Sequence, residues 1–250
     1  MEKPAIWTDT YTVRASQADV HRRLRLPALC HAMQETAAHH AVEIGAGFDD
    51  MRALEKVWVL YKMRLVLTRT LCWQETFRVE TWVRDLRGPY SSRDFYVRDG
   101  AGDIVVRASF LWVTLDWTSR KPVRIGDVGH LFPLLPERQA LTDLPGKLPE
   151  VPLTGPCWST IARYSDTDLA GHVNNAAYLR WMYDSLDPAF RDAHEVSELE
   201  IHFLGETHES NPIEVYNVLS PAIPPVQDFS VRSSGKEVSR ARLVWRTLPA

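Results

Sequence analysis

The chain carries the same order of elements twice, one helix followed by several strands, with a proline-rich stretch between the two copies. Residues 133–156 hold six of the sixteen prolines. Proline at this density disfavours both helix and central strand. We therefore interpret this stretch as a linker and expect an N-terminal unit at 1–132 and a C-terminal unit at 157–250.

In the first segment, apolar residues at helical spacing predict a helix that opens at Pro27 and ends before Gly45. Alternating apolar residues predict strands, and residues 99–103 (DGAGD) predict a hairpin between the last two. The predicted strands of this segment are 7–14, 57–67, 77–83, 91–98 and 104–115.

The second segment repeats this plan, with strands expected at 158–164, 196–204, 213–219, 229–232 and 238–245. Residues 14–19 align with residues 163–168 at a constant offset, so that Asp19 matches Asp168 and Arg23 falls where His172 stands. The pattern predicts an α+β fold of two helix-plus-antiparallel-sheet units. An edge strand exposes unpaired backbone N–H and C=O groups. Two units that join edge to edge in one continuous sheet would pair these groups.

Polar residues gather before the helix of the second segment: Asp168, Gly171, His172, Asn174 and Asn175. Either asparagine can cap that helix. The N-terminus of a helix has unpaired N–H groups and a positive dipole end, so it can hold a carbonyl oxygen that gains negative charge. The pattern suggests acyl chemistry. A well-capped helix behind a polar turn remains the plain alternative.

Residues 163–186 read RYSDTDLAGHVNNAAYLRWMYDSL and resemble the active-site segment of acyl-acyl-carrier-protein thioesterases, in which S-D-x-D-x-N-x-H-V-N-N-x-x-Y-x-x-W recurs. Ala170 departs from the pattern, since plant members usually have Asn there. Further landmarks lie in the first half at residues 34–35, 58–60, 93–95 and 108–112. The resemblance covers nearly the whole chain and implies a tandem hotdog fold, a pseudo-dimer of two such units.

The resemblance also implies site residues. A catalytic glutamate is expected on the strand after the helix, and the best alignment of residues 199–207 (LEIHFLGET) gives Glu206, with Glu200 and Glu209 as alternatives. Glu206 would activate water. His172 would form a hydrogen bond with the thioester carbonyl or with the departing sulfur. Asp168 would orient a partner or share the role of the base. The oxyanion and positioning groups are expected at Gly171, Val173, Asn174 and Asn175.

By the same resemblance, the acyl chain would enter a tunnel in the N-terminal unit, and the C-terminal unit would be catalytic. The expected wall residues of the tunnel are Met33, Trp58, Trp82 and Trp112. The expected partner is acyl carrier protein with an acyl-phosphopantetheine thioester. An acyl-CoA thioesterase of the same fold and a non-catalytic acyl-carrier-protein or acyl-chain binder remain alternatives.

Composition excludes other classes. Cys30, Cys72 and Cys157 have scattered spacing, which argues against a disulfide framework and for a reducing cytoplasm. We expect no metal site and no cofactor. A net charge of −3 without a basic stripe argues against nucleic acid. The first ten residues lack the layout of a signal peptide. No apolar run approaches the roughly 20 residues that span a bilayer. We expect the chain to be a monomeric pseudo-dimer or a homodimer.

Overall fold

The computed structural model describes residues 3–220 and 222–248. The chain divides into two compact units, residues 1–145 and 146–250, and this division falls inside the proline-rich stretch. Among the described residues, no helix combines the length and the apolar character that crossing a bilayer requires.

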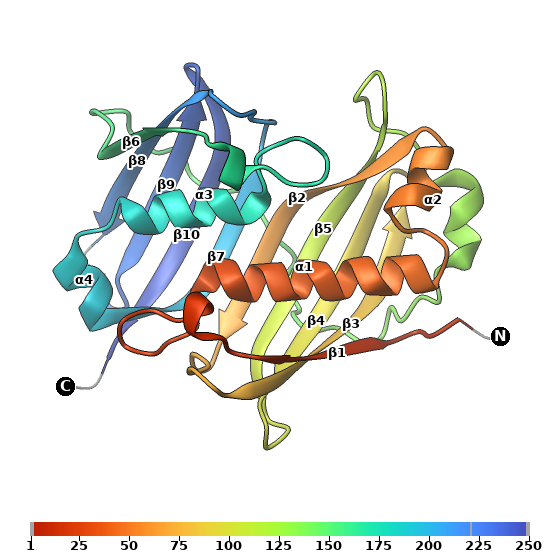
Figure 1. Cartoon of the computed structure of the whole chain (residues 1–250), viewed down its shortest axis with the longest axis horizontal. Helices are drawn as coiled ribbons and strands as arrows, with labels where there is room; N and C mark the ends of the chain where they lie inside the picture. Colours follow the sequence, from red (N-terminus) through yellow and green to blue (C-terminus); the bar gives the residue numbers. More distant parts are fainter. Residues whose placement is uncertain (1–2, 221, 249–250) are drawn as a thin grey trace. The chain divides into compact units, whose positions relative to one another are not determined.

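Unit 1 is a long helix on an antiparallel sheet (Figure 1). The strands follow the order β1-β3-β4-β5-β2 across the sheet. The elements are β1 (Trp7–Thr12), the 3-10 turn η1 (Ala15–Gln17), α1 (Leu26–Glu43), α2 (Phe48–Ala53), β2 (Lys56–Leu67), β3 (Thr76–Arg87), β4 (Tyr90–Arg98), β5 (Ile104–Asp116) and η2 (Gly126–Leu131).

The helix α1 begins and ends where its sequence signals predict. Pro27 occupies the first turn, where its missing N–H costs no hydrogen bond. Gly45, just beyond the end, has a φ of +73°, a conformation that glycine adopts without strain. The helix buries one face, including Leu29, Cys30 and Met33, against the sheet.

Unit 2 repeats this arrangement with shorter helices. Its antiparallel sheet has the order β6-β8-β9-β10-β7, so each strand holds the place of its counterpart in unit 1. The elements are β6 (Trp158–Ile161), η3 (Tyr164–Asp166), α3 (Asn175–Asp184), α4 (Pro188–Ala193), β7 (His194–Phe203), β8 (Pro212–Ser220), β9 (Val226–Ser233) and β10 (Lys236–Thr247). The predicted α+β class, with two helix-plus-antiparallel-sheet units, is confirmed.

The first part of the proline-rich stretch packs on the sheet of unit 1. Leu135 N–H donates to the Val83 carbonyl at 3.0 Å, and the Trp82 indole N–H donates to Arg138 O at 2.6 Å. The Ala140 N–H donates to Asp94 Oδ2 at 2.8 Å. These bonds satisfy polar groups that a loosely attached segment would leave to solvent, so residues 133–145 are part of unit 1.

Candidate functional site

A compact turn precedes α3 and carries the polar residues that the sequence singles out. The Asp168 N–H donates to His172 O at 2.9 Å, and the Gly171 N–H donates to Asp168 O at 3.0 Å. Asp168 Oδ1 accepts the N–H of Ala170 at 2.9 Å. Gly171 has a φ of +76°, which suits glycine. The exposed carboxylate of Asp168 therefore holds the shape of this turn.

The turn leads into a capped helix. Asn174 is the N-cap of α3, and its side-chain oxygen accepts the Ala176 N–H at 2.9 Å. The Asn174 N–H itself donates to Asp166 O at 2.8 Å. Asp166 is buried, and its carboxylate also accepts the Arg163 N–H at 2.7 Å. Asn174 is thus the cap, and Asn175 is the first residue of the helix.

A backbone hydrogen bond joins this turn to the segment after β7. The Val173 N–H donates to Thr207 O at 2.8 Å. As a result His172 and Glu206, far apart in the sequence, lie side by side, with His172 Nε2 3.4 Å from Glu206 Oε2. Both side chains are partly open to solvent, with exposed fractions of 25% and 36%. The structure therefore brings together an imidazole and a carboxylate beside the N-terminus of α3.

His208 is a third polar residue at this place, and it is not among the residues that the sequence predicted. Its ring centroid lies 4.9 Å from that of His172. One ligand atom from each of His172, Glu206 and His208 lies within 4.8 Å of the others. A histidine two residues after the candidate carboxylate was an available signal, since residues two apart share a side where the chain is extended.

Tyr178 lies beneath the site, in the first turns of α3. Burial raises the pKa of the Tyr178 phenol to about 12, while the neighbouring Thr207 hydroxyl lowers it and the Asp168 carboxylate raises it further. Thr207 Oγ1 is buried beside this phenol without an aligned hydrogen-bond partner among the described residues. The buried hydroxyl of Thr207 therefore faces Tyr178.

Two of the backbone groups expected at the oxyanion position have hydrogen-bond partners within the protein. The N–H groups of Gly171 and Val173 both donate to carbonyl oxygens within the protein, those of Asp168 and Thr207. These two groups stabilise the turn and its attachment, and they are not available to a substrate oxygen in this conformation. The sequence indicates that these N–H groups lie near the site, but it does not indicate their hydrogen-bond partners.

Unit 1 contains a copy of the same turn. The Asp19 N–H donates to Arg23 O at 2.8 Å, the same bond that joins Asp168 to His172 O. The side chains differ, because Arg23 Nε forms an ion pair with Asp19 Oδ2 at 2.8 Å. An arginine that is always charged cannot replace the imidazole as a proton donor and acceptor.

The hydrogen bond that joins the turn to a distant segment also occurs in both units. In unit 1 the Leu24 N–H donates to Leu71 O at 2.8 Å, so Leu71 is the counterpart of Thr207. The residue before Leu71 is Thr70, which therefore stands where unit 2 has Glu206. The matching hydrogen bonds support the duplication that the sequence suggested. At the positions of His172 and Glu206, unit 1 has Arg23 and Thr70 instead.

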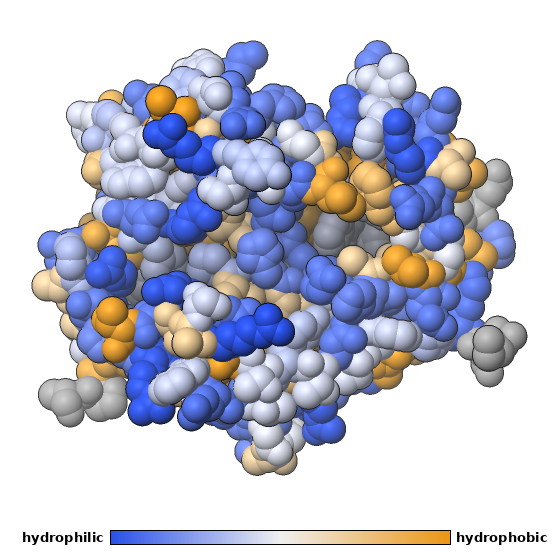
Figure 2. All heavy atoms as spheres, in the orientation of Figure 1, coloured by the Kyte–Doolittle hydropathy of each residue, from blue (hydrophilic) through white to orange (hydrophobic). Residues whose placement is uncertain are grey.

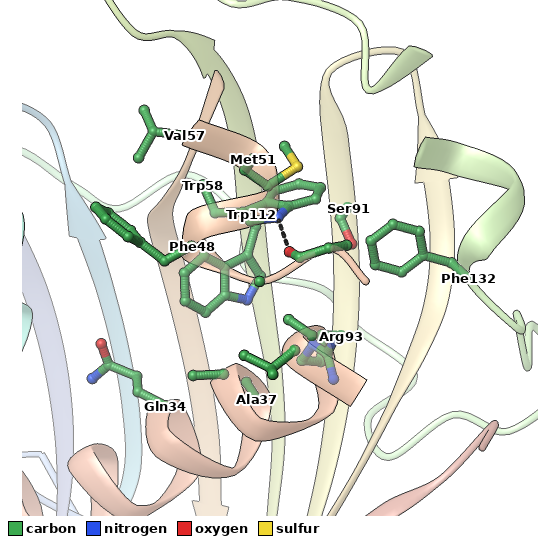
Figure 3. Close-up of a pocket in the computed structure, with 15 residues that line it drawn as sticks. Gln34, Ala37, Phe48, Met51, Val57, Trp58, Ser91, Arg93, Trp112 and Phe132 are labelled. Atoms are coloured by element: carbon green, nitrogen blue, oxygen red, sulfur yellow. Dashed lines mark hydrogen bonds between the residues drawn. The ribbon is translucent and has the colours of Figure 1, made fainter. Parts of the chain in front are cut away.

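A hollow in unit 1 lies between α1, α2 and the sheet, with hydrophobic side chains around it (Figure 2). Its volume is about 200 Å³. Its walls are mostly apolar (Figure 3): Gln34, Ala37, Ala38, Ala41, Val42, Ala46, Gly47, Phe48, Met51, Val57, Trp58, Ser91, Arg93, Trp112 and Phe132.

Two of the four predicted wall residues, Trp58 and Trp112, line this pocket. Met33 and Trp82 do not. Met33 is fully buried in the helix–sheet core, and Trp82 is fully buried with its N–H bonded to Arg138 O. Trp82 in β3 contacts the proline-rich stretch at Arg138. The position of that stretch on the sheet could not be predicted from the sequence.

Comparison with known proteins follows the same division of the chain. The family model described as Acyl-ACP thioesterase N-terminal domain matches residues 4–128, and the model described as Acyl-ACP thioesterase C-terminal domain matches residues 159–247. The chain therefore belongs to the acyl-ACP thioesterase family, as the sequence resemblance indicated.

Its relatives include plant enzymes and a bacterial protein. A chloroplastic acyl-(acyl-carrier-protein) hydrolase of Cuphea viscosissima is 24% identical, over 96% of this chain but only 63% of the relative. The 12:0-ACP thioesterase of Umbellularia californica has a TM-score of 0.87 at 24% identity, covering 98% of each chain. An acyl-ACP thioesterase from Bacteroides thetaiotaomicron has a TM-score of 0.84 at 22% identity, covering 98% of this chain and 100% of the other. The fold is thus that of the acyl-ACP thioesterases.

Proposed function

We propose that this protein hydrolyses fatty acyl-acyl-carrier-protein thioesters to free fatty acid and carrier protein, a reaction that ends fatty acid synthesis. The observation that carries the proposal is the 3.4 Å approach of His172 Nε2 to Glu206 Oε2 beside the N-terminus of α3. A carboxylate and an imidazole within reach of one reacting centre are what general acid–base hydrolysis needs. Family membership adds support for the substrate class.

In this mechanism Glu206 is the general base. Its carboxylate removes a proton from water while the water oxygen bonds to the thioester carbonyl carbon. The carbonyl π electrons move to the oxygen, and the Nε2–H of His172 donates to that developing oxyanion. When the oxyanion collapses, the C–S bond breaks and sulfur leaves with the electron pair. The sulfur then takes the proton that Glu206 holds, which regenerates the carboxylate.

Asp168 acts as a positioning residue in this scheme. Its side chain and backbone hold the turn that presents His172. The dipole of α3, capped by Asn174, adds positive potential at the site. Ala170, where plant members usually have Asn, contributes only its N–H, so no side-chain amide is available from that position.

The pocket of unit 1 is the proposed receptor for the acyl chain. An apolar cavity of about 150 Å³ holds benzene. By that scale, the volume of about 200 Å³ suits about eight methylene-sized groups. The apolar walls favour hydrocarbon over polar ligands. The proposed division of labour is therefore acyl binding in unit 1 and catalysis in unit 2.

Unit 2 supplies the one catalytic set in this proposal. Arg23 paired with Asp19, and Thr70 in place of a glutamate, leave the equivalent position of unit 1 without a base. The three cysteines are free, which suits a reducing compartment, and we propose a cytoplasmic location.

The test is thiol release from acyl-carrier-protein and acyl-CoA thioesters that carry the same saturated chains. The proposal expects faster release from the carrier-protein thioesters, and a preference for CoA would favour the acyl-CoA alternative. Binding of acyl carrier protein without any release would leave a binding module. Glu206→Gln should slow release by about 10²- to 10⁴-fold. Glu200→Gln is the matched control and should release thiol as the wild type does, because Glu200 instead contacts His202 Nε2 at 3.1 Å.

A further inference from the structure

We propose that His172, Glu206 and His208 form a binding site for a divalent transition metal, with Zn²⁺ as the best fit, and that the bound ion switches off hydrolysis. The three ligand atoms lie within 4.8 Å of one another. The binding claim stands on the geometry alone, and only the inhibition rests on the proposed function.

The donor set selects the class of metal. Two imidazole nitrogens and one carboxylate oxygen are a common zinc ligand set, with a fourth position left for water. Hard cations such as Mg²⁺ prefer oxygen ligands and near-octahedral geometry. The cluster therefore favours Zn²⁺ or a similar transition metal over Mg²⁺ or Ca²⁺.

The distances fit a tetrahedral ion with little rearrangement. Ligands about 2.0 Å from zinc in tetrahedral geometry lie about 3.3 Å from one another. His172 Nε2 and Glu206 Oε2, 3.4 Å apart, already match that edge. His208 is exposed, so its ring can turn toward the same point without displacing core residues.

The backbone around the three ligands is well supported. Thr207 O accepts the Val173 N–H at 2.8 Å, which fixes the spacing between the two segments. The His208 N–H donates to Asn211 Oδ1 at 3.0 Å. Both histidines and the glutamate are therefore attached to backbone that is held on each side, which lowers the entropy lost when a metal binds.

Within the part of the chain that the structure describes, the other clusters of histidine and acidic residues lack this arrangement. His39 lies between two carboxylates, but Nδ1 contacts Asp9 at 2.8 Å and Nε2 contacts Glu35 at 3.2 Å. Its two nitrogens point to different carboxylates, so they cannot bind one ion. In the unit 1 copy of the turn, Arg23 stands at the position of His172, and a guanidinium cation does not bind metals.

Metal binding and hydrolysis require the same two side chains. A zinc ion binds His172 Nε2 only when that nitrogen carries no proton, so His172 can no longer donate an N–H to the oxyanion. The same ion takes the Glu206 carboxylate, which then cannot remove a proton from water. His208 takes no part in that mechanism. We therefore expect Zn²⁺ to inhibit the wild type and to inhibit a His208 variant much less.

The experiment measures Zn²⁺ binding with ZnCl₂ and a chromophoric chelator as competitor, for the wild type, His208→Ala, Glu206→Gln and His39→Ala. We expect one tight site per chain. Changing only an outer partner of a metal ligand typically weakens binding by about 10- to 100-fold, so losing a ligand at His208 or Glu206 should weaken it at least tenfold. His39→Ala, the matched control, should bind as the wild type does, and MgCl₂ should not compete.

Equal zinc affinity in the wild type and in both ligand variants would overturn the site, as would the absence of a stoichiometric site in the wild type. The inhibition claim has its own readout, thiol release with and without ZnCl₂. Inhibition that remains equally strong in His208→Ala would contradict it. If the wild type releases no thiol at all, the proposed function fails while the binding result still decides the metal site.

Discussion

His40 should make the stability of this protein depend on pH in the mildly acidic range. The side chain is fully buried in α1. Its Nε2–H donates to Pro4 O at 2.8 Å, and its Nδ1 accepts a hydrogen bond from Arg93 at 2.8 Å. A proton on Nδ1 would face the arginine N–H. Burial, together with the charge of Arg93, lowers the pKa of His40 to about 4.

The sign and size follow from the difference between the folded and unfolded states. An unfolded histidine has a pKa of about 6.5. Because the folded pKa is depressed, the unfolded chain binds a proton first as the pH falls. The stability that neutral His40 supports is complete above the unfolded pKa and is lost as the pH falls from about 6.5 toward 4. At about pH 5 the loss from this residue alone is about 2 kcal/mol.

The assay is urea unfolding of the wild type and His40→Gln near neutral pH and at about pH 5. The variant cannot titrate here, so its fall in unfolding free energy should be smaller by about 2 kcal/mol. His40→Asn serves as a second variant with the same comparison, made within each protein so that a general loss of stability cancels. An equal fall in wild type and variants would refute the reasoning.

Three further changes test an ion pair, a helix cap and a turn. Asp9 raises the pKa of His39 mainly through a hydrogen bond. The stability that this contact contributes is therefore present below the unfolded pKa and is lost as the pH rises through the folded pKa. His39→Gln should therefore lie further below the wild type in urea midpoint in mild acid than in mild alkali. Asn174→Ala removes the cap of α3 and should cost about 1 kcal/mol in urea unfolding, while an unchanged midpoint would argue against the cap. Gly171 has a φ of +76°, and a Cβ added there would meet no atom within 4 Å. Gly171→Ala should therefore cost about 1 kcal/mol of backbone strain, seen as a lower midpoint without loss of helix by circular dichroism.

The order of elements was predictable from the sequence because periodicity and turn chemistry act locally. The helix at Pro27, the hairpin at residues 99–103 and the repeated strand order all appear as expected. The errors lie at ends and short elements. The strand expected at 158–164 ends at Ile161, and the chain enters the 3-10 turn η3 at Tyr164.

Two short helices, α2 and α4, were not predicted. Each has six residues, too few to be stable alone. For α4 the signals were nevertheless present, with Asp187 as N-cap and Pro188 in the first turn. Such helices form because the chain around them is already folded, which sequence periodicity does not record.

The candidate site was predictable only in part. The polar turn before α3 could be found from spacing and resemblance, since its residues are neighbours in the chain. The resemblance predicted Glu206, and the structure shows a backbone hydrogen bond from the Val173 N–H to Thr207 O beside its approach to His172. This long-range bond has no local sequence signal. The same bond removes the Val173 N–H as an oxyanion donor, and it brings His208 to the site.

The most direct test of the central claim is a double-variant comparison of kcat on one acyl-acyl-carrier-protein thioester, with His172→Ala, Glu206→Gln and both changes together. If the pair acts as one unit, each single change lowers kcat by about 10²- to 10⁴-fold, and the double variant is no slower than the slower single variant. Losses that multiply in the double variant would show that the two side chains act independently. A Glu206→Gln variant with wild-type kcat would contradict the account.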